Sequence, residues 1–459
     1  MKLDDSVNSE IGLNKGIFMS GITNVIYLLV VVIIGFVFYT NRSDNQSSDT
    51  KKIRFLSLAW QKQCVDANKR IVAEWNTLHP DKEIEYMQGV WEGVHDYLIT
   101  GFETGDLPDI IHYESSFIID FALRGYLADL SPYLSAEIKE DIVDPAWAMV
   151  TRTNGEIMGV PFLLEPYVIY YNKDHFEQAG ITAPTLESPW SYNDLRRAAK
   201  KLTLDTDGDG RIDRWGAAMG MRRLSGQMVN LSMSFGGSFL QKEDGKNVVR
   251  VGEEEKQLLK IIRDMIYEDE SLTRASLGKT STETFPGFFS GRYSMVLMMG
   301  IWGRQQMMEN APDGFPWGAF LVPKAKSQII GTVSQTLSIP QKSAKKTEAA
   351  QFIEFFLSTP NMGELALGDW LVPTRKSCYE MPEFQTTEAY WDLATSAVNT
   401  LAASPWHGVP GFEEWRKRVA IPLFQEYFAN RLSLEETCNR MEIESNMVLS
   451  RYQGRVEKW

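Results

Sequence analysis

Residues 53–113 read IRFLSLAWQKQCVDANKRIVAEWNTLHPDKEIEYMQGVWEGVHDYLITGFETGDLPDIIHY. Apolar runs of strand length at 53–59 and 109–113 are separated by helical stripes, such as Ala67 and Ile71 at i, i+4 spacing. A strand, helix, strand, helix, strand order predicts a parallel sheet with helices on its faces. Ligands of such sheets lie beyond the carboxyl ends of the strands, so the side chains that follow each strand are the first candidates for a binding site.

A second α/β region follows the first. Ser191 is the predicted N-cap of a helix, residues 253–267 carry a helical apolar stripe, and residues 293–299 (YSMVLMM) read as a buried strand. The chain has 459 residues, of which 44% are hydrophobic and 23% charged. This length and composition are typical of a globular α/β protein with about two to three domains or lobes.

The charge balance and the metal-binding residue types exclude several classes of function. Forty-seven Lys and Arg against 60 Asp and Glu give a net charge of −13, which would repel a phosphate backbone, so nucleic acid is not an expected partner. Three cysteines contain no close pair, and five histidines contain no H-x-x-x-H pair. Neither a disulfide framework nor a zinc site is therefore expected.

Residues 17–39 read IFMSGITNVIYLLVVVIIGFVFY and contain no charged residue. At about 1.5 Å per residue such a helix spans roughly 35 Å, enough to cross a hydrocarbon core of about 30 Å. No A-x-A cleavage site follows it, and the first cysteine is Cys64, so a permanent anchor is favoured over a cleaved signal peptide or a lipoprotein leader. Residues 1–16 then form a cytoplasmic N-terminus, and residues 40–52 a polar flexible linker.

Four segments resemble, in order, those of family 1 extracellular solute-binding proteins of the maltose- and multiple-sugar-binding type. They are GDLPDIIHYESSFIIDFALRGYLADLSPYL (105–134), GEIMGVPFLLEPYVIYYNKDHFEQAGI (155–181), SMVLMMGIW (294–302) and LVPTRKS (371–377). The resemblance implies an α/β, two-lobed, periplasmic-binding-protein-like clamp with an interlobe hinge, behind one transmembrane helix. Its lobes are predicted at 53–165 plus 314–358 (N-terminal) and at 166–313 plus 359–459 (C-terminal).

The function implied by the resemblance is capture of a carbohydrate in the interlobe cleft and its delivery to the permease subunits of an ABC importer. The protein is then not an enzyme, needs no cofactor, and is a single-pass protein of the cell membrane with its binding domain outside the cytoplasm. Two alternatives stay open. Glu114 and Glu165 could serve a tethered carbohydrate-active enzyme as an acid and base pair, or the chain could be a sugar-sensing subunit with the same site and a different partner.

Sugar rings offer C–H faces that favour flat aromatic surfaces and hydroxyls that favour carboxylates, amides and guanidinium groups. We therefore expect the ligand-binding residues among aromatic and polar side chains near strand ends and crossings. In relatives that resemble this chain, an acid at the position of Glu165 and a tryptophan at that of Trp302 contact the sugar. The predicted ligand-binding residues are Trp60, Gln61, Gln63, Tyr113, Glu114, Ser115, Glu165, Trp302, Trp370 and Arg375.

Residues 205–216 read DTDGDGRIDRWG and resemble a calcium-binding loop. Oxygen ligands at positions 1, 3, 5, 7 and 9 of an EF-hand-like loop suit Ca²⁺. The predicted ligands are Asp205, Asp207, Asp209, the Arg211 carbonyl and Asp213. Position 12 is Gly216 rather than the usual bidentate Glu, and an Asx-rich turn without metal is the alternative. A structural Ca²⁺ ion is thus a possible addition to a protein that requires no cofactor.

Overall fold

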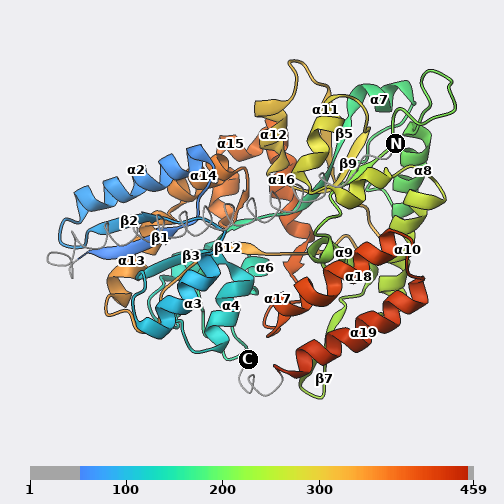
Figure 1. The fold of residues 1–459 in the computed structure, drawn as a ribbon. Coiled ribbons are helices and arrows are strands. Elements are labelled where there is room, and N and C mark those ends of the chain that lie inside the picture. The colour runs from blue at the N-terminus through green and yellow to red at the C-terminus, as the bar shows by residue number, and fades with distance from the viewer. Residues whose placement is uncertain (1–51, 453–459) are drawn as a thin grey trace, which may run out of the picture. The chain divides into compact units, whose positions relative to one another are not determined.

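Two β-sheets organise the chain from Ile53 onward, as seen in the computed structural model, which describes residues 52–452 (Figure 1). The larger sheet has six strands in the order β13-β4-β12-β3-β1-β2. Its strands are β1 (Ile53–Ser57), β2 (Ile84–Gln88), β3 (Ile110–Glu114), β4 (Val160–Leu164), β12 (Ser334–Ser338) and β13 (Val372–Pro373). Strands β2, β1 and β3 are parallel, whereas β12 is antiparallel to both β3 and β4.

Alternating residues of β1 bury the two faces of the larger sheet against different helices. Phe55 packs on Phe352 and Phe356 of α13 (Lys346–Phe356), with ring centroids 5.6 and 5.1 Å apart. Leu56 belongs to the separate core under α3 (Val94–Thr104) and α4 (Ser115–Leu123). Gly368 lets α14 (Thr359–Asp369) approach α2 (Lys62–Leu78), because a Cβ there would lie 2.8 Å from the Cys64 nitrogen. The predicted parallel arrangement of the first three strands, with helices on both faces, is confirmed, whereas the later strands β12 and β13 make the sheet mixed.

The smaller sheet has four strands in the order β10-β5-β9-β6. They are β5 (Tyr167–Asn172), β6 (Ala218–Met219), β9 (Met295–Gly300) and β10 (Trp317–Leu321). Two short ribbons pair β7 (Leu240–Glu243) with β8 (Lys246–Val249), and β11 (Ile330–Thr332) with β14 (Leu401–Ala403). Figure 1 shows the smaller sheet and its helices beside the larger sheet, so the α/β, two-lobed class is confirmed.

Helices fill the connections between strands. Those not yet given are α5 (Ala136–Asp141), α6 (Asp144–Trp147), α7 (Lys173–Gln178), α8 (Tyr192–Leu202), α9 (Ser225–Phe235), α10 (Glu253–Tyr267), α11 (Phe285–Phe289), α12 (Gly303–Asn310), α15 (Pro382–Gln385), α16 (Trp391–Ser396), α17 (Phe412–Trp415), α18 (Ile421–Phe428) and α19 (Leu434–Ser450). Short 3-10 turns lie at Arg274–Gly278, Thr282–Thr284, Lys376–Glu380, Glu388–Tyr390 and Ala397–Thr400, and a π turn at Arg416–Ala420. Ser191 caps α8 as predicted, by accepting the Asp194 N–H in a reciprocal capping box.

Two of the predicted lobe boundaries differ from the strand pairing. Strand β10 pairs with β5 in the smaller sheet, although residues 314–358 were expected in the N-terminal lobe. Strand β13 pairs with β4 in the larger sheet, although residues 359–459 were expected in the C-terminal lobe. The Pro312-Asp313-Gly314 turn looks like a crossing in the sequence, but the chain leaves the smaller sheet only after Leu321.

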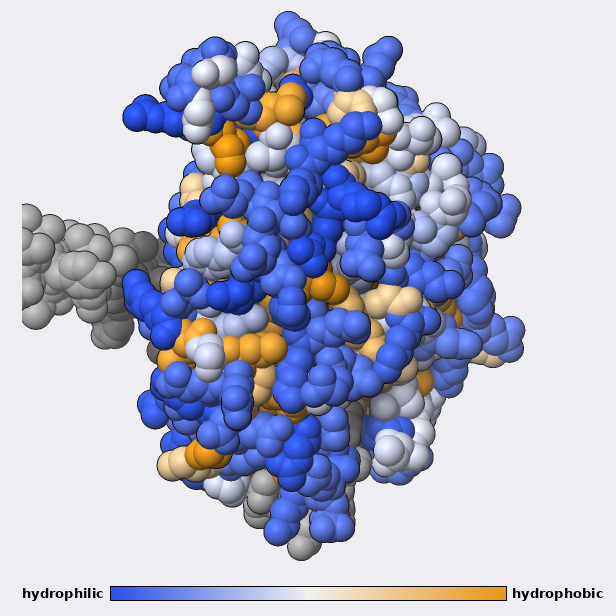
Figure 2. Space-filling view, turned by 90° about the vertical axis from the view of Figure 1, so that its right-hand side faces the viewer, coloured by the Kyte–Doolittle hydropathy of each residue, from blue (hydrophilic) through white to orange (hydrophobic). Residues whose placement is uncertain are grey.

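The predicted transmembrane segment, residues 17–39, its flank 1–16 and most of the linker 40–52 lie outside the described residues. Between residues 52 and 452, no helix combines the length and apolar character that a membrane span requires. The face shown in Figure 2 is covered mostly by hydrophilic residues, with hydrophobic ones in small separate groups.

Candidate ligand-binding site

A cavity of about 330 Å³ is lined by residues of the larger sheet and its loops and by Trp302, which follows a strand of the smaller sheet. Trp60 and Trp91 follow the carboxyl ends of β1 and β2, and Glu114 is the last residue of β3. Trp302 follows β9 of the smaller sheet, and Glu165 stands where the chain passes from β4 to β5. The volume lies at the lower end of the range for small-molecule pockets, about 300–1,000 Å³.

Three tryptophans give the cavity its aromatic surface. Trp60 is 56% exposed, an unusually large fraction for an indole, whereas Trp91 and Trp302 are half-buried. Trp91 also packs near the buried ring of Tyr113, with centroids 5.9 Å apart. Leu163, Val333 and Leu371 add smaller apolar contacts. The ring faces available here suit a ligand with flat apolar surfaces of its own.

The indole of Trp302 is positioned by Glu165. Its Nε1–H donates a hydrogen bond of 2.8 Å to Oε1 of the Glu165 carboxylate. Gly300 leaves room for this bond, because a Cβ at that position would collide with both Glu165 Oε1 and Trp302 Nε1. Burial, together with the nearby carboxylates of Glu114 and Asp369, raises the pKa of Glu165 to about 7, while the Trp302 bond opposes the shift.

Two further carboxylates line the cavity. Asp369, at the end of α14, is 1% exposed; its Oδ2 accepts a 2.8 Å hydrogen bond from Gln335 Nε2, while Oδ1 is buried without a partner. Burial raises the pKa of Asp369 to about 6. Glu114 accepts a hydrogen bond from the Ser116 hydroxyl, and burial raises its pKa as well. The cavity therefore collects three acids whose ionised forms are disfavoured by desolvation.

Four predicted residues are close in sequence to the cavity but are used elsewhere. Gln61 exchanges amide hydrogen bonds with Gln305 of α12, and Gln63 is exposed on α2. Tyr113 is buried and stacked on Phe117, with ring centroids 4.6 Å apart. Ser115 is fully buried. Its hydroxyl bonds His407 Nε2 at 2.8 Å and accepts the Ser334 N–H at 3.1 Å, so it joins α4 to β12 and to the loop at His407.

Trp370 and Arg375, also predicted to bind ligand, have structural partners instead. Arg375 is 4% exposed and pairs its guanidinium with Asp141 and Glu137. Trp370 stacks on Trp391 with centroids 5.8 Å apart, and its carbonyl accepts a hydrogen bond from Arg304. Neither residue lines the cavity. A sequence cannot tell a tryptophan that stacks on a ligand from one that stacks on another indole.

Arg304 binds backbone carbonyls around Trp370, where the chain has left-handed φ values. Its buried guanidinium donates to the carbonyls of Ile301, Trp370, Ala389 and Tyr390 and lies 3.8 Å from the centroid of a Trp391 ring. Trp370, Ala389 and Tyr390 all have left-handed φ values, of 58°, 48° and 60°. The planar fork of five N–H donors suits such converging carbonyls.

Sequence reasoning missed the polar residues that come from the later strand β12 and from helix α14. Ser334, Gln335 and Asp369 line the cavity, yet no apolar periodicity or motif marks them. Gln335 lies in the strand SQTLS, whose polar residues alone do not indicate which face meets a cavity. The usable signal is topological: β12 lies between β3 and β4, so residues at its start fall next to Glu114 and Leu163.

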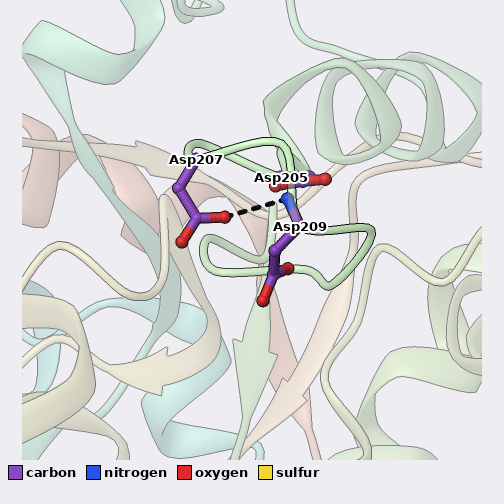
Figure 3. A group of neighbouring side chains, drawn as sticks. All are labelled: Asp205, Asp207 and Asp209. Atoms are coloured by element: carbon purple, nitrogen blue, oxygen red, sulfur yellow. Dashed lines mark hydrogen bonds between the residues drawn. The ribbon is translucent and has the colours of Figure 1, made fainter.

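The acidic loop gathers three of its predicted ligands (Figure 3). Carboxylate oxygens of Asp205, Asp207 and Asp209 lie within 4.8 Å of one another on an exposed loop. Asp205 accepts N–H bonds from Gly208 and Gly210 at 2.7 and 2.8 Å. Asp213 is different, because its carboxylate accepts both the N–H and the hydroxyl of Thr206 and is outside the group. The three oxygens fit a hard cation such as Ca²⁺, with a smaller ligand set than the sequence predicts.

Comparisons with known proteins give the family. The model of the bacterial extracellular solute-binding protein family matches residues 65–363. A Streptomyces antibioticus protein named "uncharacterized lipoprotein in oleD 5′ region" is 39% identical over 387 residues, which are 84% of this chain and 84% of that protein. The arabinooligosaccharide-binding protein of Bacillus subtilis is 25% identical over 53% of this chain and 54% of its own length.

A solved structure has the same fold. The sugar-binding protein MalE from Xanthomonas citri superposes with a TM-score of 0.76, at 17% identity, over 88% of this chain and 98% of its own. The family match covers more than half of the chain and most of the residues that line the cavity, while Trp60, Asp369 and Leu371 lie outside the matched range. The chain therefore belongs to the bacterial extracellular solute-binding protein family.

Proposed function

We propose that the protein is a membrane-tethered receptor that captures a carbohydrate in the cavity and delivers it to the permease subunits of an ABC importer. The observation that carries this proposal is the cavity itself, in which indoles that follow strands of both sheets face hydrogen-bonding carboxylates. Indoles suit the C–H faces of a sugar ring, and carboxylates suit its hydroxyls. The names of the relatives, which are binding proteins rather than enzymes, favour the same function.

A ligand that touches both sheets favours the arrangement in which the sheets are close together. Trp302 follows β9 of the smaller sheet, whereas Trp60 follows β1 and Glu114 ends β3 of the larger sheet. A sugar in contact with all three would shift the protein toward a closed form, because only that form lets both sides bind it. Closure would then be the signal that the permease recognises.

The experiment is titration of the full-length protein, purified in mild detergent, with a panel of neutral and amino saccharides by calorimetry. Trp60→Ala should weaken binding of any sugar that binds by about tenfold, since an exposed indole contributes through stacking alone. Tyr133→Ala is the matched control, because Tyr133 is also an exposed aromatic residue, 37% exposed, and does not line the cavity. Absence of binding to every saccharide would contradict the proposal.

Catalysis is the competing function, and the same samples test it. Glu114 and Glu165 both line the cavity, so an acid and base pair is chemically conceivable there. The receptor proposal requires that a bound oligosaccharide be recovered intact. Mass spectrometry after long incubation with stoichiometric protein measures this directly, and shortened products would overturn the proposal.

The membrane tether and the bound ion are further parts of the proposal. We expect residues 17–39 to stay attached as a single span, with residues 1–16 in the cytoplasm and the binding domain outside it. The intact mass of the protein extracted from the membrane fraction tests for loss of this segment. Co-purification of permease subunits distinguishes an importer receptor from a sensing subunit.

The loop of Asp205, Asp207 and Asp209 is expected to bind Ca²⁺ as a structural ion.

A further inference from the structure

Among the described residues, three acidic side chains line the cavity and no basic side chain does. Glu114, Glu165 and Asp369 line it, and within residues 52–452 no Lys, Arg or His contributes to its lining. The cation that acts on Glu114 is Arg416, whose guanidinium is held by Glu413 at 2.8 and 2.7 Å. Arg304, close to Trp302 in sequence, gives its donors to backbone carbonyls. The charge that these acids carry when ionised is therefore not balanced by a basic side chain in the cavity lining.

In Asp369, one carboxylate oxygen lacks a hydrogen-bond donor. The residue is 1% exposed, and its Oδ1 is buried without a hydrogen-bond partner, although Oδ2 accepts from Gln335. A buried carboxylate oxygen without a donor is costly, because desolvation of a charge requires both a partner and a countercharge. A neutral ligand would displace water from the other two acids and bring no countercharge. A ligand with an N–H donor and a positive charge would supply both.

A metal ion does not fit the three acids. A metal site needs several carboxylate, imidazole or thiol side chains whose ligand atoms lie close together. In the part of the chain that the structure describes, only the loop of Asp205, Asp207 and Asp209 brings three such side chains within 4.8 Å of one another. Glu114, Glu165 and Asp369 do not form such a group, so their oxygens do not all lie close enough together to enclose one metal ion. The tryptophans favour an organic cation, because an ammonium group is attracted to the face of an indole.

We propose that the ligand of this cavity is a saccharide that carries a protonated amino group. The ammonium group donates to the carboxylate of Asp369 and is attracted by the more distant carboxylates of Glu114 and Glu165, and the sugar ring lies on the indoles of Trp60, Trp91 and Trp302. This inference rests on the proposed function, because it specifies which class of sugar the receptor captures.

The test compares pairs of sugars that differ in one substituent. Full-length protein is titrated at pH 7 by calorimetry with glucose and glucosamine, galactose and galactosamine, and cellobiose, chitobiose and N,N′-diacetylchitobiose. In at least one set the free amine should bind about tenfold more tightly than its hydroxyl and N-acetyl counterparts, as expected for one charge-assisted hydrogen bond. If neutral sugars bind equally well or better, this inference is overturned and the receptor function stands. If no sugar binds, both fail.

Proton exchange provides a second readout. The pKa of Glu165 is raised to about 7 and that of Asp369 to about 6, so both acids are partly protonated in the free protein near pH 6. An ammonium ligand should expel those protons, which appears as different calorimetric heats in buffers of different ionisation enthalpy. Its affinity should also rise from about pH 5 to about pH 7, as the carboxylates ionise. Proton uptake, or affinity that falls over this range, would contradict the inference.

Charge-removing variants of similar shape assign the effect to the cavity. Asp369→Asn and Glu165→Gln should each reduce the preference for the amine by about tenfold. Glu383→Gln is the matched control, because Glu383 is exposed and does not line the cavity. Asp369→Asn removes a buried charge and should leave the melting temperature of the free protein unchanged or higher. If the two cavity variants keep the full preference for the amine, the ammonium group binds elsewhere and the inference is wrong.

Discussion

The indole N–H of Trp302 donates a 2.8 Å hydrogen bond to the carboxylate of Glu165. The two residues are 137 positions apart in the chain, and the bond joins the end of β9 to the point where the chain passes from β4 to β5. An indole held by its nitrogen cannot rotate freely about χ2. Its ring face is thus presented to the cavity before any ligand arrives, which reduces the entropy lost on binding.

A substitution at Gly300 tests this relationship while Glu165 and Trp302 themselves stay unchanged. A Cβ at position 300 would collide with Glu165 Oε1 and Trp302 Nε1, so Gly300→Ala should separate the pair. We expect a destabilisation of about 1–3 kcal/mol, typical of an overpacked site, and a loss of sugar affinity. Calorimetric titration and chemical denaturation measure the two effects. Gly278→Ala is the control, because nothing lies within 4 Å of a Cβ there; equal losses in both variants would contradict the argument.

Glu165 should also make the stability of the free protein depend on pH. Burial raises its pKa from 4.5 to about 7, so the folded state binds this proton more tightly than the unfolded state does. The contribution of Glu165 to the free energy of unfolding is therefore greatest below about pH 4.5 and falls as the pH rises to about 7, by on the order of 3 kcal/mol. Glu165→Gln should flatten this part of the profile in urea denaturation. Parallel profiles for wild type and variant would contradict the assignment.

Arg304 should be essential for stability rather than for ligand binding. It donates to four backbone carbonyls, three of them on residues with left-handed φ values. Lysine has one compact ammonium group and leaves some of these carbonyls unpaired, so Arg304→Lys should lower the free energy of unfolding by about 3 kcal/mol. Arg418→Lys, at a side chain that is 70% exposed, should change it by less than about 0.5 kcal/mol. Comparable small changes in both variants would refute this role.

Calcium should stabilise the protein through the acidic loop. If Asp205, Asp207 and Asp209 bind Ca²⁺, an excess of about a hundredfold over the Kd adds about 2.7 kcal/mol to the free energy of unfolding. Thermal melting of the full-length protein with Ca²⁺ or with a chelator measures this. Asp207→Asn should remove the difference, while the exposed Asp313→Asn should keep it. An unchanged melting temperature at millimolar Ca²⁺ would leave the Asx turn without metal as the explanation.

The sequence predicts the fold better than it predicts the site, for a physical reason. Periodicity identifies which residues are buried, and so helix α10 lies at the predicted residues 253–267. Trp60, Glu114, Glu165 and Trp302 could be found because they stand at strand ends or crossings, where the topology alone brings them together. Asp369 and Gln335 depend on how β12 and α14 pack across the sheet, which local patterns do not encode. The partners of Arg375 could not be predicted either, because Asp141 and Glu137 are more than 230 positions away in the chain.

The interleaved order of strands has a consequence for how the molecule responds to cleavage. A single proteolytic cut at Gly208 would leave an N-terminal fragment with β1 to β5 and a C-terminal fragment with β6 to β14. Each fragment would contribute strands to both sheets, since β5 pairs with β9 and β10, and β3 and β4 pair with β12. The nicked protein should therefore stay associated and migrate as one particle until a denaturant separates the pieces.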